Sequence, residues 1–250
     1  MAGLEGYLGP MVGTLVPELT FETLVLGPDS RFALAAAVVV AEAPGTAYNP
    51  LFIYGGPCSG RTHLLHAVGN YARRLYPSLG ICYVQAAEFG SGQAQDGRRG
   101  EIRGRYLDAG MLLIGDIQLL PATEAIQAEF LHVFSTLHDA GTQLVISCDR
   151  APGSLAGLDD SLRARLERGL LTEVQPPDLA TRIAILRGEA IQEGFNVPPE
   201  VLEYIASRIP ADIRELQSAL IQVATVARRN RQSVDLQLTQ TVLKDLIPQT

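Results

Sequence analysis

The sequence predicts an α/β fold with a parallel sheet, followed by a smaller part that consists only of helices. Three observations indicate it. Short apolar runs alternate with amphipathic stretches up to residue 177, and the periodicity after Pro176-Pro177 is helical throughout. Among 250 residues, 47% are hydrophobic and 19% are charged, which is typical of a folded chain with a substantial core.

Five short apolar runs are bounded by glycine, proline or polar residues, which is the pattern of strands buried on both faces of a parallel sheet. They are residues 51–54, 81–85, 111–114, 143–147 and 171–174. Between them, helical periodicity covers residues 31–42, 62–76 and 123–140, and Gly141 marks the end of the last of these helices.

After residue 177 the periodicity predicts four more helices. The first covers residues 178–193 and the second begins at residues 198–199. The third covers residues 212–228, and the fourth begins near Asp235. We therefore expect an N-terminal extension at residues 1–20, an α/β base domain at 21–177 and a helical domain at 178–250. Residues 90–104 contain five glycines, which disfavours a helix there.

The formal net charge of −7 argues against a general nucleic-acid-binding surface, because such surfaces neutralise phosphates with Lys and Arg. A cluster of Arg98, Arg99, Arg103 and Arg105 is either a local basic patch or a solvated loop and helix face. No apolar run approaches the ~20 residues that cross a bilayer. Since the N-terminus also lacks a secretion signal, we expect a cytoplasmic protein.

The three cysteines, Cys58, Cys82 and Cys148, are far apart and odd in number. None has the spacing of a zinc site, so we expect neither a disulfide framework nor a structural metal. His63 and His66 lie one helical turn apart without further candidate ligands, and we interpret them as ordinary helix residues.

The most informative segment is residues 55–62, Gly-Gly-Pro-Cys-Ser-Gly-Arg-Thr, which lies between a predicted strand and a predicted helix. This spacing is that of a phosphate-binding loop, in which backbone N–H groups and a helix N-terminus face anionic oxygens. The hydroxyl of Thr62 stands where Mg²⁺ would be bound. The alternative is a purely structural glycine-rich turn.

Arg61 occupies the position at which this loop normally has lysine. Its guanidinium keeps the charge but is planar and wider than an ammonium group, so it need not fit the same slot. Lys244 is the only lysine among 20 Lys and Arg residues, and a general bias toward arginine is therefore an alternative explanation.

A second acidic element follows the third predicted strand, where Asp116 comes directly after Gly115. In phosphate-loop enzymes, carboxylates at such a strand end hold Mg²⁺ and polarise the attacking water. Only one carboxylate is present here, and a single Asp at a strand end is a weak indication of such a site. Its combination with the phosphate loop strengthens this interpretation.

These motifs occur within a broader resemblance. From about Leu19 to Pro248 the chain resembles the AAA+ (P-loop) domain of the bacterial replication initiator DnaA, a family that includes the regulator Hda. The runs that carry the resemblance include Arg31-Phe32-Ala33, Ala41-Glu42-Ala43-Pro44-Gly45, Ala47-Tyr48-Asn49-Pro50, Gly115-Asp116-Ile117-Gln118, Leu162-Arg163-Ala164-Arg165, Pro176-Pro177-Asp178-Leu179 and Ile213-Arg214-Glu215-Leu216.

The resemblance implies a Rossmann-like base with a five-stranded parallel sheet of order 5-1-4-3-2 and a small helical lid. It also implies that ATP or ADP binds between them, with or without Mg²⁺. The implied catalytic residues are Asp116, Asp149 as sensor 1, Arg214 as sensor 2, and Arg165 as an arginine finger offered to a neighbouring subunit. The implied nucleotide contacts are Val25, Leu26, Gly55, Gly56, Cys58, Gly60, Arg61, Thr62 and His63, with Thr62 and Asp116 as Mg²⁺ ligands.

Several residues depart from the family pattern. The family has glycine at Cys58, lysine at Arg61 and an acid at Gly115, and Ser161 replaces an arginine of the subunit interface motif. The resemblance therefore implies a degenerate ATPase. The family residues of the surface that presents Arg165 to a neighbouring subunit are better retained than those of the chain's own hydrolytic centre. Losing both the lysine and the acid predicts a fall in hydrolysis of roughly a thousandfold or more.

The implied partners are DnaA or other AAA+ subunits. Family members bind single-stranded DNA through a helix that corresponds to the glycine-rich residues 90–104, so we expect this activity to be weakened. Because the sequence ends at Thr250, we expect no duplex origin binding from this chain.

Three functions remain open. The first is a regulatory DnaA paralogue, similar in layout to Hda, that binds nucleotide weakly or as ADP and docks on DnaA. The second is an active ATPase in which Arg61 and Asp116 suffice. The third is a decaying duplicate or the AAA+ fragment of a full replication initiator.

Overall fold

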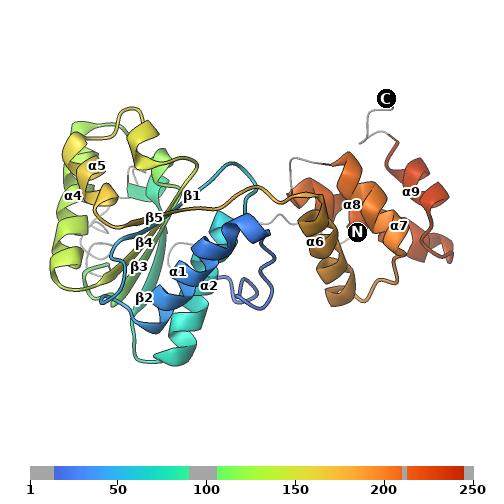
Figure 1. Cartoon of the computed structure of the whole chain (residues 1–250), viewed down its shortest axis with the longest axis horizontal. Helices are drawn as coiled ribbons and strands as arrows, with labels where there is room; N and C mark the ends of the chain where they lie inside the picture. Colours follow the sequence, from blue (N-terminus) through green and yellow to red (C-terminus); the bar gives the residue numbers. More distant parts are fainter. Residues whose placement is uncertain (1–13, 90–105, 210–212, 245–250) are drawn as a thin grey trace, which may run out of the picture. The chain divides into compact units, whose positions relative to one another are not determined.

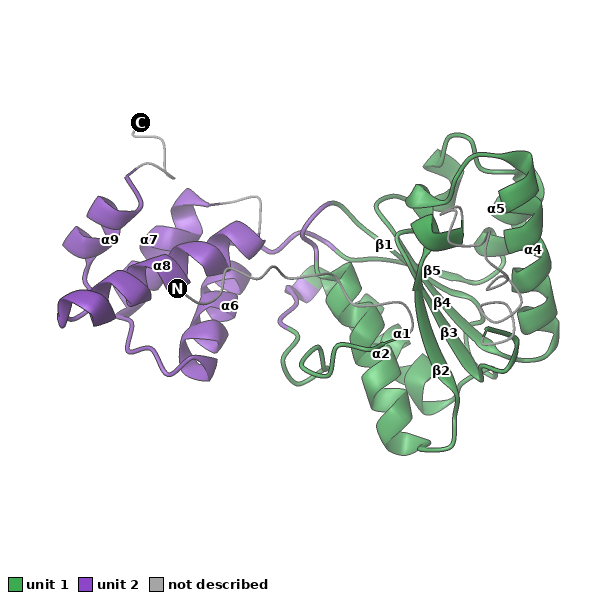
Figure 2. Ribbon diagram, turned by 180° about the vertical axis from the view of Figure 1, so that it is seen from behind, with its two compact units in different colours: residues 1–24, 29–56, 60–174 green, residues 25–28, 57–59, 175–250 purple. Residues whose placement is uncertain are grey.

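The computed structural model describes residues 14–89, 106–209 and 213–244. The glycine-rich stretch from residue 90 and the four arginines at positions 98, 99, 103 and 105 lie outside these ranges. The described residues form two compact units, one built on a sheet and one built of helices (Figure 2).

The sheet of the first unit has five parallel strands in the order β2-β3-β4-β1-β5. This is the predicted order 5-1-4-3-2 counted from the opposite edge, so the predicted fold class is confirmed. The strands are β1 (Leu51–Tyr54), β2 (Ile81–Gln85), β3 (Met111–Gly115), β4 (Gln143–Cys148) and β5 (Leu170–Glu173). Each begins within one residue of its predicted start.

Helices cover both faces of the sheet, with α1 and α2 on one face and α4 and α5 on the other (Figure 1). The helices are α1 (Arg31–Glu42), α2 (Arg61–Leu75), α4 (Glu124–Asp139) and α5 (Asp160–Glu167). Short 3₁₀ segments join them at η1 (Pro28–Ser30), η2 (Ala86–Phe89), η4 (Ile117–Leu119) and η5 (Pro152–Ser154).

The core of this unit follows from the alternation of side chains along the strands. One face of β3 presents Leu112 and Ile114 to a cluster that includes Phe130 and Phe134 of α4. On the other face, Leu113 lies close to Gly69 of α2. A Cβ atom on Gly69 would be 2.6 Å from the Cδ1 atom of Leu113. Both faces of β3 and β4 are buried, which explains their continuous apolar runs.

The second unit contains the helices α6 (Leu179–Gln192), α7 (Pro199–Arg208), α8 (Ile213–Asn230) and α9 (Leu236–Val242). They surround a core of their own that includes Leu186, Ile205 and Leu220. Asp178 caps α6 by accepting a hydrogen bond from Thr181 N, and Asp235 caps α9 by accepting one from Leu238 N. The second unit also includes residues 25–28 and 57–59.

Helix α5 was not predicted from the sequence. Among its eight residues only Leu162 and Leu166 are buried, so its apolar pattern is too short to distinguish from a loop. Within the described ranges, the structure contains no helix that is both long and apolar enough to cross a membrane.

Gly169, which directly precedes β5, provides a test of this packing. A Cβ atom there would lie 1.9 Å from the backbone oxygen of Pro50, an approach that no side-chain movement can relieve. We expect Gly169→Ala to lower the free energy of unfolding by at least about 1–3 kcal/mol in urea titrations. Gly153→Ala is the control, because its Cβ would meet only Glu167 Oε1 at 3.5 Å. Equal stability of the two variants would contradict this close approach.

Candidate nucleotide-binding site

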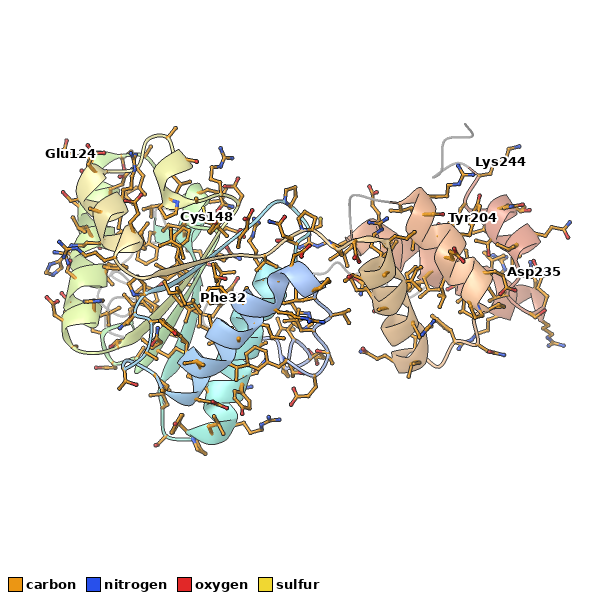
Figure 3. The ribbon with its side chains drawn as sticks, in the orientation of Figure 1. Phe32, Glu124, Cys148, Tyr204, Asp235 and Lys244 are labelled. Atoms are coloured by element: carbon orange, nitrogen blue, oxygen red, sulfur yellow. The ribbon has the colours of Figure 1, made fainter. Side chains whose placement is uncertain are left out.

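Three adjacent strands, β3, β4 and β1, bring the segments that follow them to one edge of the sheet. In open parallel sheets this carboxyl edge is where ligands bind. The 55–62 segment follows β1, Asp116 follows β3 and Asp149 follows β4. Gly55 N donates a hydrogen bond of 3.3 Å to the backbone oxygen of Cys148. Cys148, which is labelled in Figure 3, ends β4 at this edge.

The phosphate-loop segment turns directly into the first helix that follows it. Gly60 precedes α2 with φ at 97°, a left-handed conformation that favours glycine, and α2 then runs for 15 residues. The first helical hydrogen bond is donated by Leu64 N to Gly60 O, so the N–H groups of the first turn have no intrahelical acceptor. Together with the helix dipole, these donors favour an anionic group at this position.

Two hydroxyl groups in this segment are available to a ligand. Ser59 is only 3% exposed, and its Oγ atom has no hydrogen-bond partner among the described residues. A buried hydroxyl without a partner is unfavourable by about 1–3 kcal/mol, and a ligand oxygen would relieve this. Thr62 is exposed at the start of α2. The segment therefore fits the phosphate groups of a nucleotide.

Cys58 adopts a left-handed backbone conformation with φ at 57°. A side chain in this region costs roughly 1–2 kcal/mol relative to right-handed conformations, and glycine avoids this penalty. The family resemblance places glycine at this position. The sequence analysis found the substitution but not its backbone strain.

Arg61 is held by its own loop and by the acid at the end of β3. Its Nη1 atom donates to the backbone oxygens of Gly55 and, at 3.3 Å, of Gly56. Its Nη2 atom lies 3.6 Å from Asp116 Oδ1, and the side chain is 12% exposed. The guanidinium therefore lies under the loop with its charge partly balanced by Asp116.

Asp116 and Asp149 are joined through Gln118. Gln118 Nε2 donates to Asp116 Oδ1 at 3.1 Å, and Gln118 Oε1 accepts from Asp149 N at 3.2 Å. Asp116 itself has φ at 52°, and its backbone N–H donates to Ser147 Oγ at 3.0 Å. Gln118 was quoted in the sequence analysis only as part of a family run, and its bridging position became visible only in the structure.

Asp149, the predicted sensor 1 residue, pairs with its neighbour. Arg150 donates through Nε and Nη2 to the two carboxylate oxygens of Asp149, each at 2.8 Å. This hydrogen bonding lowers the pKa of Asp149 below its ordinary value, and the charges of Arg150 and Arg61 act in the same direction. The carboxylate therefore stays ionised and paired.

The space beside Gly115 is filled by two side chains of β2 that the sequence analysis did not select. A Cβ atom on Gly115 would lie 2.8 Å from both Tyr83 Oη and Gln85 Oε1. Gln85 Nε2 donates to Tyr83 Oη at 2.5 Å. Burial, and secondarily the charges of Asp116 and Glu88, raise the pKa of Tyr83, so its hydroxyl stays neutral.

The magnesium site that the family implies lacks one of its carboxylates here, because Gly115 stands in the place of the first acid. No group of three or more His, Cys, Asp or Glu side chains with metal-binding geometry occurs within the described part of the chain. Mg²⁺ is usually held through one or two carboxylates and substrate phosphates. Asp116 is the single acid at the strand end, and it already pairs with Arg61.

The remaining predicted site residues lie elsewhere. His63 Nε2 is hydrogen-bonded to Thr20 O at 2.9 Å, so its side chain anchors the segment before α1. Val25 and Leu26 are half-buried and belong to the second unit, as does Arg214, which is exposed in the first turn of α8.

Arg165 lies in the last turn of α5 and is half-buried. Its side chain has no hydrogen bond or ion pair with another described residue. The structure therefore brings Arg61, Asp116 and Asp149 together at one edge, whereas it leaves Arg165 without a partner of its own.

A five-stranded parallel sheet of this order, with a phosphate-loop segment after β1 and a helical second unit, defines the AAA+ class of nucleotide-binding proteins. The family model described as the bacterial DnaA ATPase domain matches residues 15–173. The chain belongs to this family.

Individual relatives agree with this assignment. The chain is 52% identical over 238 residues to the chromosomal replication initiator protein DnaA of Mycobacteroides abscessus, covering 94% of this chain and 48% of that protein. It thus spans about half the length of this curated relative. Domain III of Thermotoga maritima DnaA is 38% identical with a TM-score of 0.87, and the match covers 94% of this chain and all of that one.

A third relative is a DnaA structure described as bound to AMPPCP and single-stranded DNA. It is 30% identical with a TM-score of 0.75, and the match covers 87% of this chain and 69% of that chain.

The strain at Cys58 predicts a gain in stability on substitution by glycine. Removing the left-handed penalty contributes roughly 1–2 kcal/mol, and the greater freedom of glycine in the unfolded chain offsets about 0.5–1 kcal/mol of it. We therefore expect Cys58→Gly to raise the free energy of unfolding by about 0.5–1 kcal/mol in urea titrations. Cys58→Ala, which retains the Cβ atom, should not gain, and an equal gain in both variants would refute the strain.

The buried His66 predicts a pH dependence of stability. Its Nδ1 atom accepts from Val16 N at 3.3 Å, its ring packs against Tyr83, and burial, assisted by the charge of His63, lowers its pKa to about 4. Below the pKa of ~6.5 in the unfolded chain, unfolding takes up a proton, so stability falls as pH drops from about 6.5 to 4.

We expect this loss to amount to roughly 3 kcal/mol relative to His66→Gln, whose side-chain oxygen retains an acceptor for Val16 N. The measurement is urea unfolding of both proteins across this pH interval. Parallel pH profiles of the two would show that His66 does not titrate as described.

Proposed function

We propose that the chain binds an adenine nucleotide through residues 55–62, hydrolyses it poorly, and acts in or regulates initiation of chromosomal replication by docking on DnaA or on a second copy of itself. The observation that carries the proposal is the position of the Arg61 guanidinium. It is bound to the carbonyl groups of Gly55 and Gly56 and paired with Asp116 in an otherwise complete phosphate loop.

Nucleotide binding is supported by the loop itself and by family members. The α2 N-terminus and the partnerless hydroxyl of Ser59 suit phosphate oxygens. The DnaA structure described as bound to AMPPCP shares the fold at 30% identity. We propose Val25, Leu26, Gly55, Gly56, Cys58, Gly60, Arg61, Thr62 and His63 as the contacting positions. In that arrangement, residues 21–177 form the base, 178–250 form the lid and Arg214 is sensor 2.

Poor hydrolysis follows from the groups that face the reaction centre. Hydrolysis requires a positioned water and stabilisation of the charge that develops on the transferred phosphoryl group. The Asp116 carboxylate is engaged by Arg61 and Gln118, and Asp149 is engaged by Arg150. Losing about 4 kcal/mol of transition-state stabilisation corresponds to roughly a thousandfold in rate.

Docking on another AAA+ subunit is supported by Arg165. An arginine without a hydrogen bond or ion pair to the described residues of its own chain suits the nucleotide of a neighbour, where such a residue raises phosphoryl-transfer rates by roughly 10³–10⁵. Its helix is fixed by Asp159, which accepts hydrogen bonds from Ser161 N and Leu162 N. The surface that would present Arg165 to a neighbouring subunit therefore has contacts of its own, separate from those of the Arg61 site.

A second candidate function is that of the ATPase domain of a full replication initiator. The 52% identity that extends over 94% of this chain but only 48% of the Mycobacteroides abscessus DnaA favours it. If this candidate is correct, we expect the purified chain to turn over ATP at a rate that Arg61→Ala lowers. If the chain is a pseudo-ATPase as proposed, we expect ATP turnover close to background in both the unmodified chain and Arg61→Ala.

Mixing the chain with ATP-loaded DnaA of Mycobacteroides abscessus tests the docking proposal. We expect either faster phosphate release from DnaA or shorter DnaA filaments, depending on whether the docked chain supplies Arg165 or caps an end. If phosphate release is stimulated, Arg165→Ala should reduce this stimulation at least about tenfold, because the arginine finger would be absent. The control is Arg168→Ala, an exposed neighbour on the same segment. No change in either release or filament size would refute the proposal.

A further inference from the structure

We infer that the pairing of Arg61 with Asp116 removes the carboxylate that a divalent metal would need, so that the site binds its nucleotide without Mg²⁺. This inference rests on the proposed nucleotide-binding function and specifies how that site is regulated. It begins from the disagreement between the residues present and the magnesium site of the family.

The first support is the charge balance at the carboxyl edge. The two carboxylates that follow β3 and β4 are both paired, Asp116 with Arg61 at 3.6 Å and Asp149 with Arg150 at 2.8 Å. These four side chains sum to zero net charge. A divalent cation there would gain one carboxylate only by displacing a guanidinium, which removes most of the electrostatic advantage of binding.

The second support is that neutral side chains occupy the space beside Gly115 at the strand end. The space beside Gly115 holds Tyr83 Oη and Gln85 Oε1, each 2.8 Å from the Cβ position, and both side chains are neutral. Neutral oxygens attract a hydrated divalent cation far less than a carboxylate does. The position therefore provides no charge to replace the missing acid.

The third support is the donor arrangement of Arg61. A guanidinium has five N–H groups, and the two on Nη1 are directed to the backbone oxygens of Gly55 and Gly56. The Nε group donates to no described residue, and Nη2, which lies 3.6 Å from Asp116 Oδ1, forms an ion pair but no hydrogen bond with it. A planar fork of this kind binds phosphate oxygens through two parallel hydrogen bonds. Because the side chain is only 12% exposed, its charge is less screened than that of a surface arginine.

Taken together, these contacts make Arg61 a fixed internal cation. Two carbonyl groups anchor it through Nη1, and Asp116 pairs with it at Nη2. In the proposed site, the donors of its Nε–Nη2 edge bind the phosphates.

Calorimetric titration of the full chain with ADP and with ATP tests the inference, in EDTA and in millimolar MgCl₂. We expect the dissociation constant for either nucleotide to change by less than about threefold between the two conditions. Arg61→Ala should weaken binding by at least about tenfold in both conditions, because the phosphates then lose the donors of the guanidinium. Arg73→Ala, which removes an exposed arginine of the same helix, is the matched control and should bind as the unmodified chain does.

A second variant restores the ligand set of the family. Arg61→Lys combined with Gly115→Asp and Gln85→Ala should acquire at least about tenfold tighter binding in MgCl₂ than in EDTA. Paramagnetic resonance of Mn²⁺ gives an independent readout. With ADP present, adding the unmodified chain should not change the Mn²⁺ spectrum from that of Mn²⁺ and ADP alone. Adding the triple variant should change it.

The outcomes separate the two claims. Nucleotide binding by the unmodified chain that tightens about tenfold or more with Mg²⁺ would overturn the metal-free site and leave the proposed function standing. Absence of nucleotide binding in every condition would overturn the proposed function itself. Urea titrations establish that each variant is folded, and if the triple variant is not, the comparison of the unmodified chain with Arg61→Ala still decides.

Discussion

The arrangement of the candidate site depends on where the Arg61 charge is placed. A guanidinium that is 12% exposed must find acceptors, and it finds them in the backbone oxygens of Gly55 and Gly56 and in Asp116. These acceptors explain why the loop closes on itself and why the carboxylate after β3 is directed toward it. The same contacts engage the Asp116 carboxylate, so one ion pair connects the phosphate-loop segment with the end of β3.

The sheet topology supplies the second constraint. Because β4 lies between β3 and β1, the residues that follow these strands must meet at one edge, whatever their side chains are. The backbone bond from Gly55 N to Cys148 O and the bond from Asp116 N to Ser147 Oγ tie all three loops together. The fold therefore keeps the site assembled even though individual family residues have been replaced within it.

Much of this could be predicted from the sequence, and the limits have physical causes. The strand β1 and the helix α1 were predicted with their observed bounds, because an apolar run flanked by turn residues and an uninterrupted helical periodicity are local signals. The site residues Tyr83 and Gln85 were not predicted. They act on Gly115 from the neighbouring strand β2, and contacts between strands do not appear in any local pattern. Likewise, the strain of Cys58 depends on a backbone angle, not on residue type.

The separation between Arg61 and Arg165 gives these observations a common interpretation. Backbone acceptors and Asp116 hold Arg61 within the chain, which suits the proposed binding of a nucleotide without its hydrolysis. Arg165 lies on a helix with its own cap and has no hydrogen bond or ion pair with another described residue. Because the described contacts of Arg61 and Arg165 are separate, the proposed loss of hydrolysis at the first site would not of itself remove the proposed action of Arg165 on the nucleotide of a neighbouring subunit.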